Sequence, residues 1–322
     1  MGSLFNFYGK YGREQEKQEK LWIKKSRLIY VSVFVILLSF FTFSAFNISV
    51  SADDGSIVMN DKARIDFSGA NNTGGVKVNV LSKTDKNFKI TVEKGDVKYT
   101  YNLKNDTTAE VYPLQLGDGE YTVKVYMNAG ATDRYAFALA AKYTVKLTDP
   151  LAPFLNPSQY VYFTEKSKIT EKAAELVQNC GTEIEKVEKI YNFVISSLAY
   201  DTDKANAAAS GQLSGYLPSA DAVLNSGKGI CFDYATVFTA MLRSQGIPAK
   251  LVTGYVKPDN LYHAWNEFYL KDKGGWFKIN DMKFAAKKFE RVDPTFDSTS
   301  KSSKKVLEFI GDGSNYSKFL EY

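Results

Sequence analysis

The feature that most constrains this chain is an uncharged, apolar run of 19 residues from Leu28 to Phe46. A helix of this length can just cross the hydrocarbon core of a bilayer, which is about 30 Å thick. Nothing amphipathic flanks the run, which argues against a buried core helix. Lys24, Lys25 and Arg27 precede it. Because basic residues stay on the cytoplasmic side of a membrane, we expect residues 53–322 to lie outside.

The start of the chain can be a retained anchor or a cleaved signal. Residues 1–27 form a basic tail that is long for a signal peptide, which favours a cytoplasmic tail followed by a transmembrane anchor within residues 28–52. Val50, Ser51 and Ala52 are small or modest in size, as signal peptidase requires, so secretion after cleavage near Ala52 stays open. We therefore expect an extracytoplasmic protein, either anchored with its N-terminus in the cytoplasm or secreted.

Charge outside the tail is almost balanced. The formal net charge is +5; residues 1–27 contribute +4 and residues 28–52 none, so residues 53–322 carry only +1. A basic surface is therefore not indicated, and we expect no nucleic-acid partner. Two cysteines are too few for a disulfide scaffold. The chain has one histidine, which makes the surroundings of that residue informative.

Residues 53–147 have the pattern of an all-β domain. Alternating or Val- and Tyr-rich runs cover Ala63–Phe67, Val76–Val80, Phe88–Val92, Val97–Leu103, Tyr121–Met127 and Tyr135–Leu147. Turn-forming residues separate these runs, and short strands at this spacing predict a β-sandwich. The segment shows no cluster of catalytic residue types, so we expect it to act as a spacer or binding domain. Residues 148–165 contain three prolines within DPLAPFLNP and are interpreted as a linker.

Residues 166–322 change to a helical pattern, so the fold class we expect is α+β. Apolar residues from Ile169 to Cys180 recur on one helix face, which Gly181 ends, and this makes Cys180 a packing residue. Thr182 and Glu185 form a capping box that starts a second helix. The small and polar residues 201–217 predict a long loop.

Cys231 is the candidate nucleophile. It lies in GKGICFDYA, and the apolar spacing after it predicts a helix that ends near Gly246 and Pro248. The free N–H groups and dipole at a helix N-terminus favour a thiolate, by up to ~2 kcal/mol. That effect alone leaves activation incomplete, so a nearby imidazolium is needed. Asp233 and Tyr234 are interpreted as helix-start and packing groups.

His263 supplies the imidazole. It lies in YHAWNEFYL, a period-2 strand pattern that places His263, Trp265 and Glu267 on one face. A third polar group must hold the imidazole tautomer, and Asp293 in RVDPTFD is the best choice, near a strand end before a proline. The chain order is then cysteine, histidine, aspartate.

At this point the sequence resembles a known family. The segments GKGICFDYA, LRSQGIPAKLVTGYV, YHAWNEFYL and VDPTFDS are similar, in content and order, to the transglutaminase-like superfamily, and within it to bacterial exported proteins. The resemblance covers roughly residues 150–320. It implies a papain-like catalytic domain over residues 166–322, with Cys231 as nucleophile, His263 as base and Asp293 as the orienting residue.

One departure from the family leaves the third residue open. The family places its aspartate four residues after a strand aromatic, soon after the histidine strand. Here Trp276 plus four is Asn280, followed by Asp281, whereas Phe289 plus four is Asp293. If residues 271–288 contain an insertion, Asp293 is the partner; a simple hairpin would instead bring Asn280 or Asp281 to His263.

The expected chemistry is acyl transfer through a thioester. Cys231 attacks the amide of a protein or peptide substrate, which we expect at the cell surface or in the cell wall, and an amine or water then accepts the acyl group. Crosslinking transglutaminase, cysteine protease and peptide amidase share the first half-reaction. A non-enzymatic surface-binding module is the alternative from another class. We expect no cofactor and no metal, since one histidine and two distant cysteines make no zinc spacing. A Cys180–Cys231 disulfide, which would silence the site, also stays open.

Overall fold

The computed structural model describes residues 49–50, 55–130, 134–257, 260–277, 294–295 and 315–322. Most of the first 54 residues, including the apolar run, lie outside the described residues. Among the helices that are described, none has the length and apolar character needed to cross a membrane.

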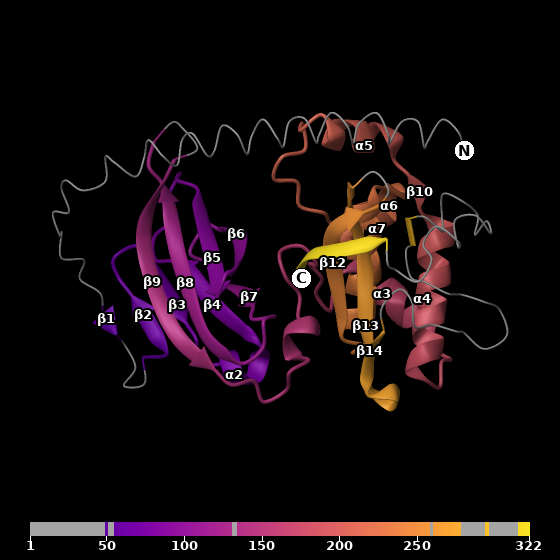
Figure 1. The fold of residues 1–322 in the computed structure, drawn as a ribbon, viewed down its shortest axis with the longest axis horizontal. Coiled ribbons are helices and arrows are strands. Elements are labelled where there is room, and N and C mark those ends of the chain that lie inside the picture. Colours follow the sequence, from indigo (N-terminus) through magenta and orange to yellow (C-terminus); the bar gives the residue numbers. More distant parts are fainter. Residues whose placement is uncertain (1–48, 51–54, 131–133, 258–259, 278–293, 296–314) are drawn as a thin grey trace.

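The N-terminal part is built from two antiparallel sheets (Figure 1). One contains β1 (Ser49–Val50), β2 (Ile57–Met59), β3 (Ala63–Asp66), β4 (Gly75–Val80) and β7 (Glu110–Pro113), in that order; the other has the order β6 (Val97–Leu103), β5 (Phe88–Lys94), β8 (Gly119–Asn128), β9 (Tyr135–Val145). A short helix, α2 (Ala70–Thr73), joins β3 to β4. Buried residues alternate with exposed ones along β3, β6 and β8, as two stacked sheets require. The strand pattern predicted from the sequence is therefore confirmed.

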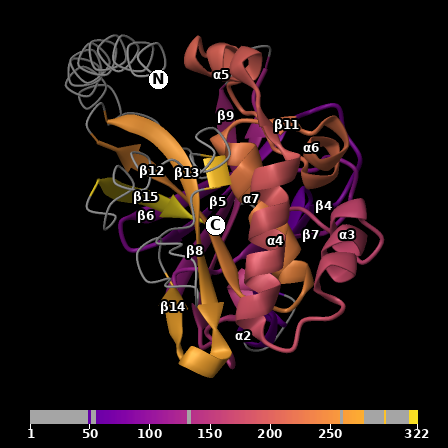
Figure 2. The same ribbon diagram turned by 90° about the vertical axis from the view of Figure 1, so that its right-hand side faces the viewer.

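Helices surround α7 in the second part of the chain. The elements are α3 (Lys168–Val177), α4 (Glu183–Ser197), α5 (Thr202–Ala209), α6 (Ala220–Ser226) and α7 (Cys231–Ser244). Every residue of α7 from Asp233 to Arg243 is buried, so this helix is the centre of the domain (Figure 2). The chain as a whole is thus α+β, with β-sheets first and the helical region after them.

Three local expectations can be compared with these helices. The capping box is confirmed: Thr182 accepts from the backbone N–H of Glu185, and the Glu185 side chain accepts from that of Thr182. The first helix, however, ends at Val177 and does not reach Cys180. The loop predicted over residues 201–217 was wrong in its first half, because α5 forms there. This helix buries none of its side chains, so the sequence carries no apolar stripe to reveal it.

A four-stranded antiparallel sheet packs against α7. Its order is β14 (Gly275–Phe277), β13 (Leu261–Leu270), β12 (Ala249–Val256), β15 (Tyr316–Glu321). A separate parallel pair, β10 (Ala199–Tyr200) with β11 (Lys228–Gly229), lies just before α7. The strand predicted around His263 is therefore confirmed, and β15 arrives beside β12 from the far end of the chain.

The segment interpreted as a linker is ordered and packed. It contains the 3₁₀ helix η1 (Ala152–Phe154), and all three of its residues are buried. Phe154 meets Trp276 edge-on at 5.0 Å, and the ammonium of Lys250 lies over both rings. The buried guanidinium of Arg243 in α7 donates to the backbone oxygen of Asn156 at 2.8 Å. Residues 152–156 are therefore held against the second part of the chain.

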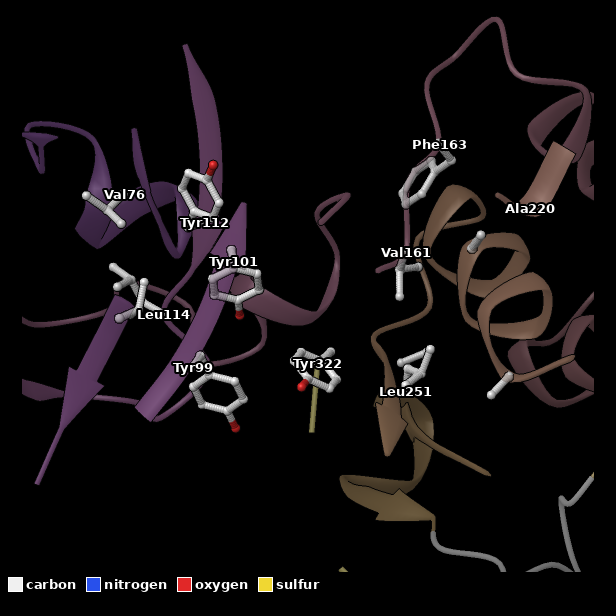
Figure 3. Packing of buried hydrophobic residues seen from close by; sticks show 14 of the residues in the cluster. Val76, Tyr99, Tyr101, Tyr112, Leu114, Val161, Phe163, Ala220, Leu251 and Tyr322 are labelled. Carbon is white, nitrogen blue, oxygen red and sulfur yellow. The ribbon is translucent and has the colours of Figure 1, made fainter. Parts of the chain in front are cut away.

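Tyrosines join the two parts of the chain (Figure 3). Tyr99 and Tyr101 of β6 pack edge-on against Tyr322, with ring centroids 5.5 and 6.5 Å apart. Tyr160 lies between Tyr322 at 4.4 Å and Phe232 at 5.9 Å. This aromatic cluster continues the hydrophobic core from the β-sheets to the residue that follows Cys231.

Candidate active site

Cys231 is the first residue of α7. Ile230 precedes it as the N-cap in an extended conformation, and the thiol side chain is partly buried. The backbone before Cys231 passes close to Asp233, and this requires glycine at position 229: a Cβ there would lie 2.6 Å from Cβ of Asp233. The first N–H groups of a helix have no acceptor within the helix, so they and the dipole are available to a thiolate or an oxyanion. The sequence prediction that Cys231 begins a helix is confirmed.

Asp233 holds the start of this helix together. It is completely buried, and its Oδ2 accepts from the backbone N–H of Ile230 at 2.8 Å. The same carboxylate receives the ammonium of Lys204 and the hydroxyl of Tyr216, each at 2.6 Å. Its role at the helix start agrees with the sequence interpretation, but its two partners from residues 202–217 were not foreseen.

Asn266 sets how α7 and β13 lie against each other. Its Nδ2 donates to the backbone oxygen of Ala235 at 2.9 Å and to Oγ1 of Thr239 at 2.7 Å. Farther along, Phe268 pairs with Ala249, which follows the end of α7 by five residues. Helix and strand therefore run in the same direction, with their N-terminal ends together.

This alignment brings Cys231 and His263 to the same end of the layer. Cys231 precedes Ala235 by four residues, about 6 Å of helix, and His263 precedes Asn266 by three residues, about 10 Å of strand. Strand alternation places Tyr262 on the side of Asn266, and His263 on the side of Trp265. His263 therefore leaves β13 on the face opposite to the one that meets α7, at the same end of the layer as Cys231.

His263 lies in an aromatic setting and is only 3% exposed. Its ring is stacked near Trp265, with centroids 6.5 Å apart, and Tyr316 of β15 lies 6.3 Å away. Trp265 and Tyr316 themselves meet edge-on at 5.1 Å. These contacts restrict how the imidazole can turn. Sequence reasoning missed Tyr316, because only the pairing of β15 with β12 brings it here.

Gly254 allows β15 to approach this aromatic wall. It pairs with His263 on one side and with Lys318 on the other, and the pairing with β15 shifts at this point. A Cβ at position 254 would lie 2.8 Å from the Trp265 ring and would also overlap the backbone oxygen of Ser317. The absence of a side chain is therefore what lets three strands meet behind His263.

Tyr262 of β13 interacts electrostatically with Cys231, although the residue is 48% exposed. Burial raises the pKa of its hydroxyl, and the neighbouring Tyr255 and Cys231 raise it further. Tyr255 and Tyr262 are cross-strand partners with ring centroids 5.5 Å apart. Together they place aromatic surface beside Cys231.

The remaining predicted residues divide into two groups. Asp293, Asn280 and Asp281 lie outside the described residues, so the third member of the triad stays a prediction. The described start of residues 271–288 is a hairpin that pairs Phe268 with Phe277, so the insertion that would favour Asp293 has to lie after Phe277. Cys180 and Cys231 are both free thiols, so the disulfide left open by the sequence is not formed. Cys180 is partly buried and packs against the hydrophobic core from the turn after α3. Within the described ranges, no three His, Cys, Asp or Glu side chains converge as a metal site.

Comparison with known proteins adds a family to this geometry. Residues 170–280 match the model of the transglutaminase-like superfamily. The kyphoscoliosis peptidases of Mus musculus and Homo sapiens are each 28% identical to this chain over 127 residues. That match covers 36% of this chain but only 18% of each peptidase.

Two solved structures show weaker likeness. A candidate cysteine protease from Cytophaga hutchinsonii has a TM-score of 0.36 at 16% identity, covering 77% of this chain and 85% of that one. Red sea bream transglutaminase has a TM-score of 0.32 at 11% identity, covering 76% and 55%. Likeness at these TM-scores is too weak to support an argument about function.

The close approach at Gly254 gives a testable prediction. Gly254→Ala should lower the free energy of unfolding by about 1–3 kcal/mol, the usual range for overpacking a filled site. It should also reduce the reactivity of the site, because β15 and Trp265 must move away from His263. Chemical denaturation followed by circular dichroism measures the first effect.

Gly275→Ala is the matched control. No described atom lies within 4 Å of a Cβ at that position of β14. Equal stability losses in the two variants would show that the contact at Gly254 is not a constraint.

Proposed function

Residues 170–280 of this chain belong to the transglutaminase-like superfamily, and from this premise we propose that the protein is a thiol enzyme that forms an acyl-enzyme on Cys231. The acyl group comes from an amide of a protein or peptide. An amine accepts it in a crosslinking reaction, or water accepts it in hydrolysis.

The observation that carries this proposal is the alignment of α7 with β13 by Asn266. It brings the N-terminal cysteine of a buried helix and the single histidine of the chain to one end of the layer. A thiol and an imidazole in this relation are the parts needed for nucleophilic catalysis on a carbonyl. Trp265 and Tyr316 would restrict the orientation of the His263 imidazole.

The steps follow from these groups. The Cys231 sulfur attacks the carbonyl carbon while His263 takes the thiol proton. The free N–H groups at the start of α7 stabilise the negative oxygen that forms. The bond from carbon to nitrogen then breaks, His263 gives its proton to the leaving amine, and a thioester remains on Cys231. An amine or water attacks the thioester and restores the thiol.

Hydrolysis of a peptide bond is a second outcome of the same chemistry. It is favoured by the relatives, since the curated proteins that match this chain are named peptidases. Because the match spans less than a fifth of those proteins, their activity is a hypothesis for this chain.

One incubation separates the two outcomes from each other and from a binding module without activity. A peptide that carries glutamine and a second peptide with a free amine are mixed with the protein, and the products are identified by mass spectrometry. Crosslinking, deamidation and backbone cleavage give three different masses. Unchanged peptides over a range of substrate sequences would favour the non-enzymatic module.

The first prediction concerns the two cysteines. Cys231→Ala should abolish turnover and leave the protein folded, because both side chains are small. Cys180→Ala is the matched control: it should cost some stability and leave turnover near normal. Activity assays with circular dichroism on both variants check this. Loss of activity in the Cys180 variant alone would show that the two cysteines have been assigned the wrong roles.

The second prediction concerns the third member of the triad. Asp293→Ala should leave thiol and imidazole in loose geometry, and loss of tautomer control costs up to ~10⁴ in rate in a comparable triad. Asn280→Ala and Asp281→Ala should each cost no more than about tenfold, or about 1.4 kcal/mol of barrier. A folded Asp293 variant with normal turnover, beside an inactive Asn280 or Asp281 variant, would move the triad to the earlier position.

We also propose that the enzyme works outside the cytoplasm, on protein or peptide substrates at the cell surface or in the cell wall. The support is the basic tail and apolar run that precede residue 53. Protease added to intact cells, or to cells stripped of their wall, should therefore digest residues 55–322 or find them already released. Full protection of these residues until the membrane is lysed would contradict export.

A further inference from the structure

A buried charged network lies at the start of the nucleophile helix. The Asp233 carboxylate is fully buried, and it accepts from Lys204 Nζ and Tyr216 OH, each at 2.6 Å, and from the Ile230 N–H at 2.8 Å. The Lys204 ammonium also lies over the Tyr216 ring, 4.2 Å from its centroid. Lys204 belongs to α5, a helix with no buried residues, and its side chain reaches the first turn of α7.

The network lies near Cys231 because Asp233 belongs to the same helical turn. Asp233 follows Cys231 by two residues, and the N–H that it accepts belongs to Ile230, the residue just before Cys231. The carboxylate and the thiol therefore occupy the same first turn of α7. A carboxylate and a thiolate in the same helical turn interact appreciably when the site is poorly solvated.

The sign of that interaction matters. A buried carboxylate beside a thiol disfavours the thiolate, which works against the helix dipole. The Lys204 cation cancels that charge. Burial and the hydrogen bond to Asp233 raise the pKa of Tyr216, so this hydroxyl stays protonated and adds no charge. The balance therefore rests on one anion and one cation.

We propose that Lys204 is a positioning residue for the nucleophile: it neutralises Asp233, which the helix start needs as a cap, and so allows Cys231 to ionise. The inference rests on the proposed function, since it concerns the same thiol. It gives α5 a charge-balancing role in that function. Asp233 caps the start of α7, and its charge at the same time disfavours the Cys231 thiolate.

The elements near α7 carry other titratable groups, which stay constant in the comparison below. They include Tyr200 of β10, Asp221 of α6, Lys228 of β11, Tyr255 of β12, and Tyr262 and His263 of β13. Because the variants leave all of them in place, a difference between the variants reports on Lys204 and Asp233.

The test measures the rate of Cys231 alkylation by iodoacetamide against pH, on the full chain, with site assignment by mass spectrometry. Lys204→Met should move the midpoint of the profile up by about one pH unit, which makes alkylation about tenfold slower at a pH below the midpoint. Asp233→Asn should move the midpoint down, because it leaves the cation without its partner. The double variant should return close to the wild-type midpoint.

Opposite shifts are what distinguish this role from a structural one. A network that only supports the fold would change both single variants in the same direction, and that result would overturn the proposal, as would unchanged midpoints in both. If Asp233→Asn does not fold, Lys204→Met decides alone, since Lys204 is 21% exposed and easier to replace. Lys204→Arg should keep the wild-type midpoint.

Two controls keep the measurement specific. Lys172→Met is matched to Lys204→Met, because Lys172 also pairs with a carboxylate, Glu175 at 2.9 Å, and lies over an aromatic ring, Phe193 at 5.4 Å, yet sits on α3. It should leave the Cys231 profile unchanged. Cys180 is an internal reference whose own profile should not move in any variant.

The result is separable from the proposed function. Alkylation needs no turnover, so the shifts can appear even if no amide substrate reacts, which would leave this inference standing and remove the enzyme proposal. Turnover that depends on Cys231 without any shift in the Lys204 variant would do the reverse.

Discussion

The bond between Asn266 and α7 is the constraint on which the site depends. A buried amide with two acceptors on one helix, Ala235 O and Thr239 Oγ1, allows only one register between strand and helix. A shift of one residue would turn Asn266 away from α7 and leave its Nδ2 unpaired in the core, where its Oδ1 already has no partner among the described residues. With this register in place, the start of α7 and the start of β13 lie at the same end of the layer. Cys231 and His263 are thus carried by two regular elements, α7 and β13, rather than by loops.

Around this register, the other layers hold the two reactive groups from different sides. Behind His263, the close approach of β15 over Gly254 places Tyr316 and Trp265 against the imidazole. Behind α7, Tyr160 packs on Phe232 and receives the hydroxyl of Thr236 on its backbone oxygen at 3.1 Å. Through Tyr160 and Tyr322, the aromatic cluster reaches β6, so the N-terminal sheets support the helix that carries Cys231. The β-domain is therefore a structural support of the site as well as a possible binding surface.

The sequence predicted the parts of this arrangement that are local. Period-3.6 apolar spacing identified α7, period-2 spacing identified β13, and Thr182 with Glu185 marked a helix start, because each pattern is written within one element. The pairing of β15 with β12 could not be read in this way, since it joins residues at least 60 positions apart. The ion pair between Lys204 and Asp233 could not be predicted either, because α5 has no apolar stripe and the sequence does not indicate which carboxylate a single lysine will bind. The orienting residue, Asp293 or instead Asn280 or Asp281, is still a sequence prediction.

The central claim is that Cys231 carries an acyl group during turnover. Intact-protein mass spectrometry after rapid acid quenching, with an amide substrate in excess, tests it most directly. The account predicts an added mass equal to the acyl part of the substrate, located on the peptide that contains Cys231, removed by neutral hydroxylamine as a thioester should be, and absent from Cys231→Ala. Substrate turnover with no adduct under any quench time, or an adduct on a residue other than Cys231, would contradict the account.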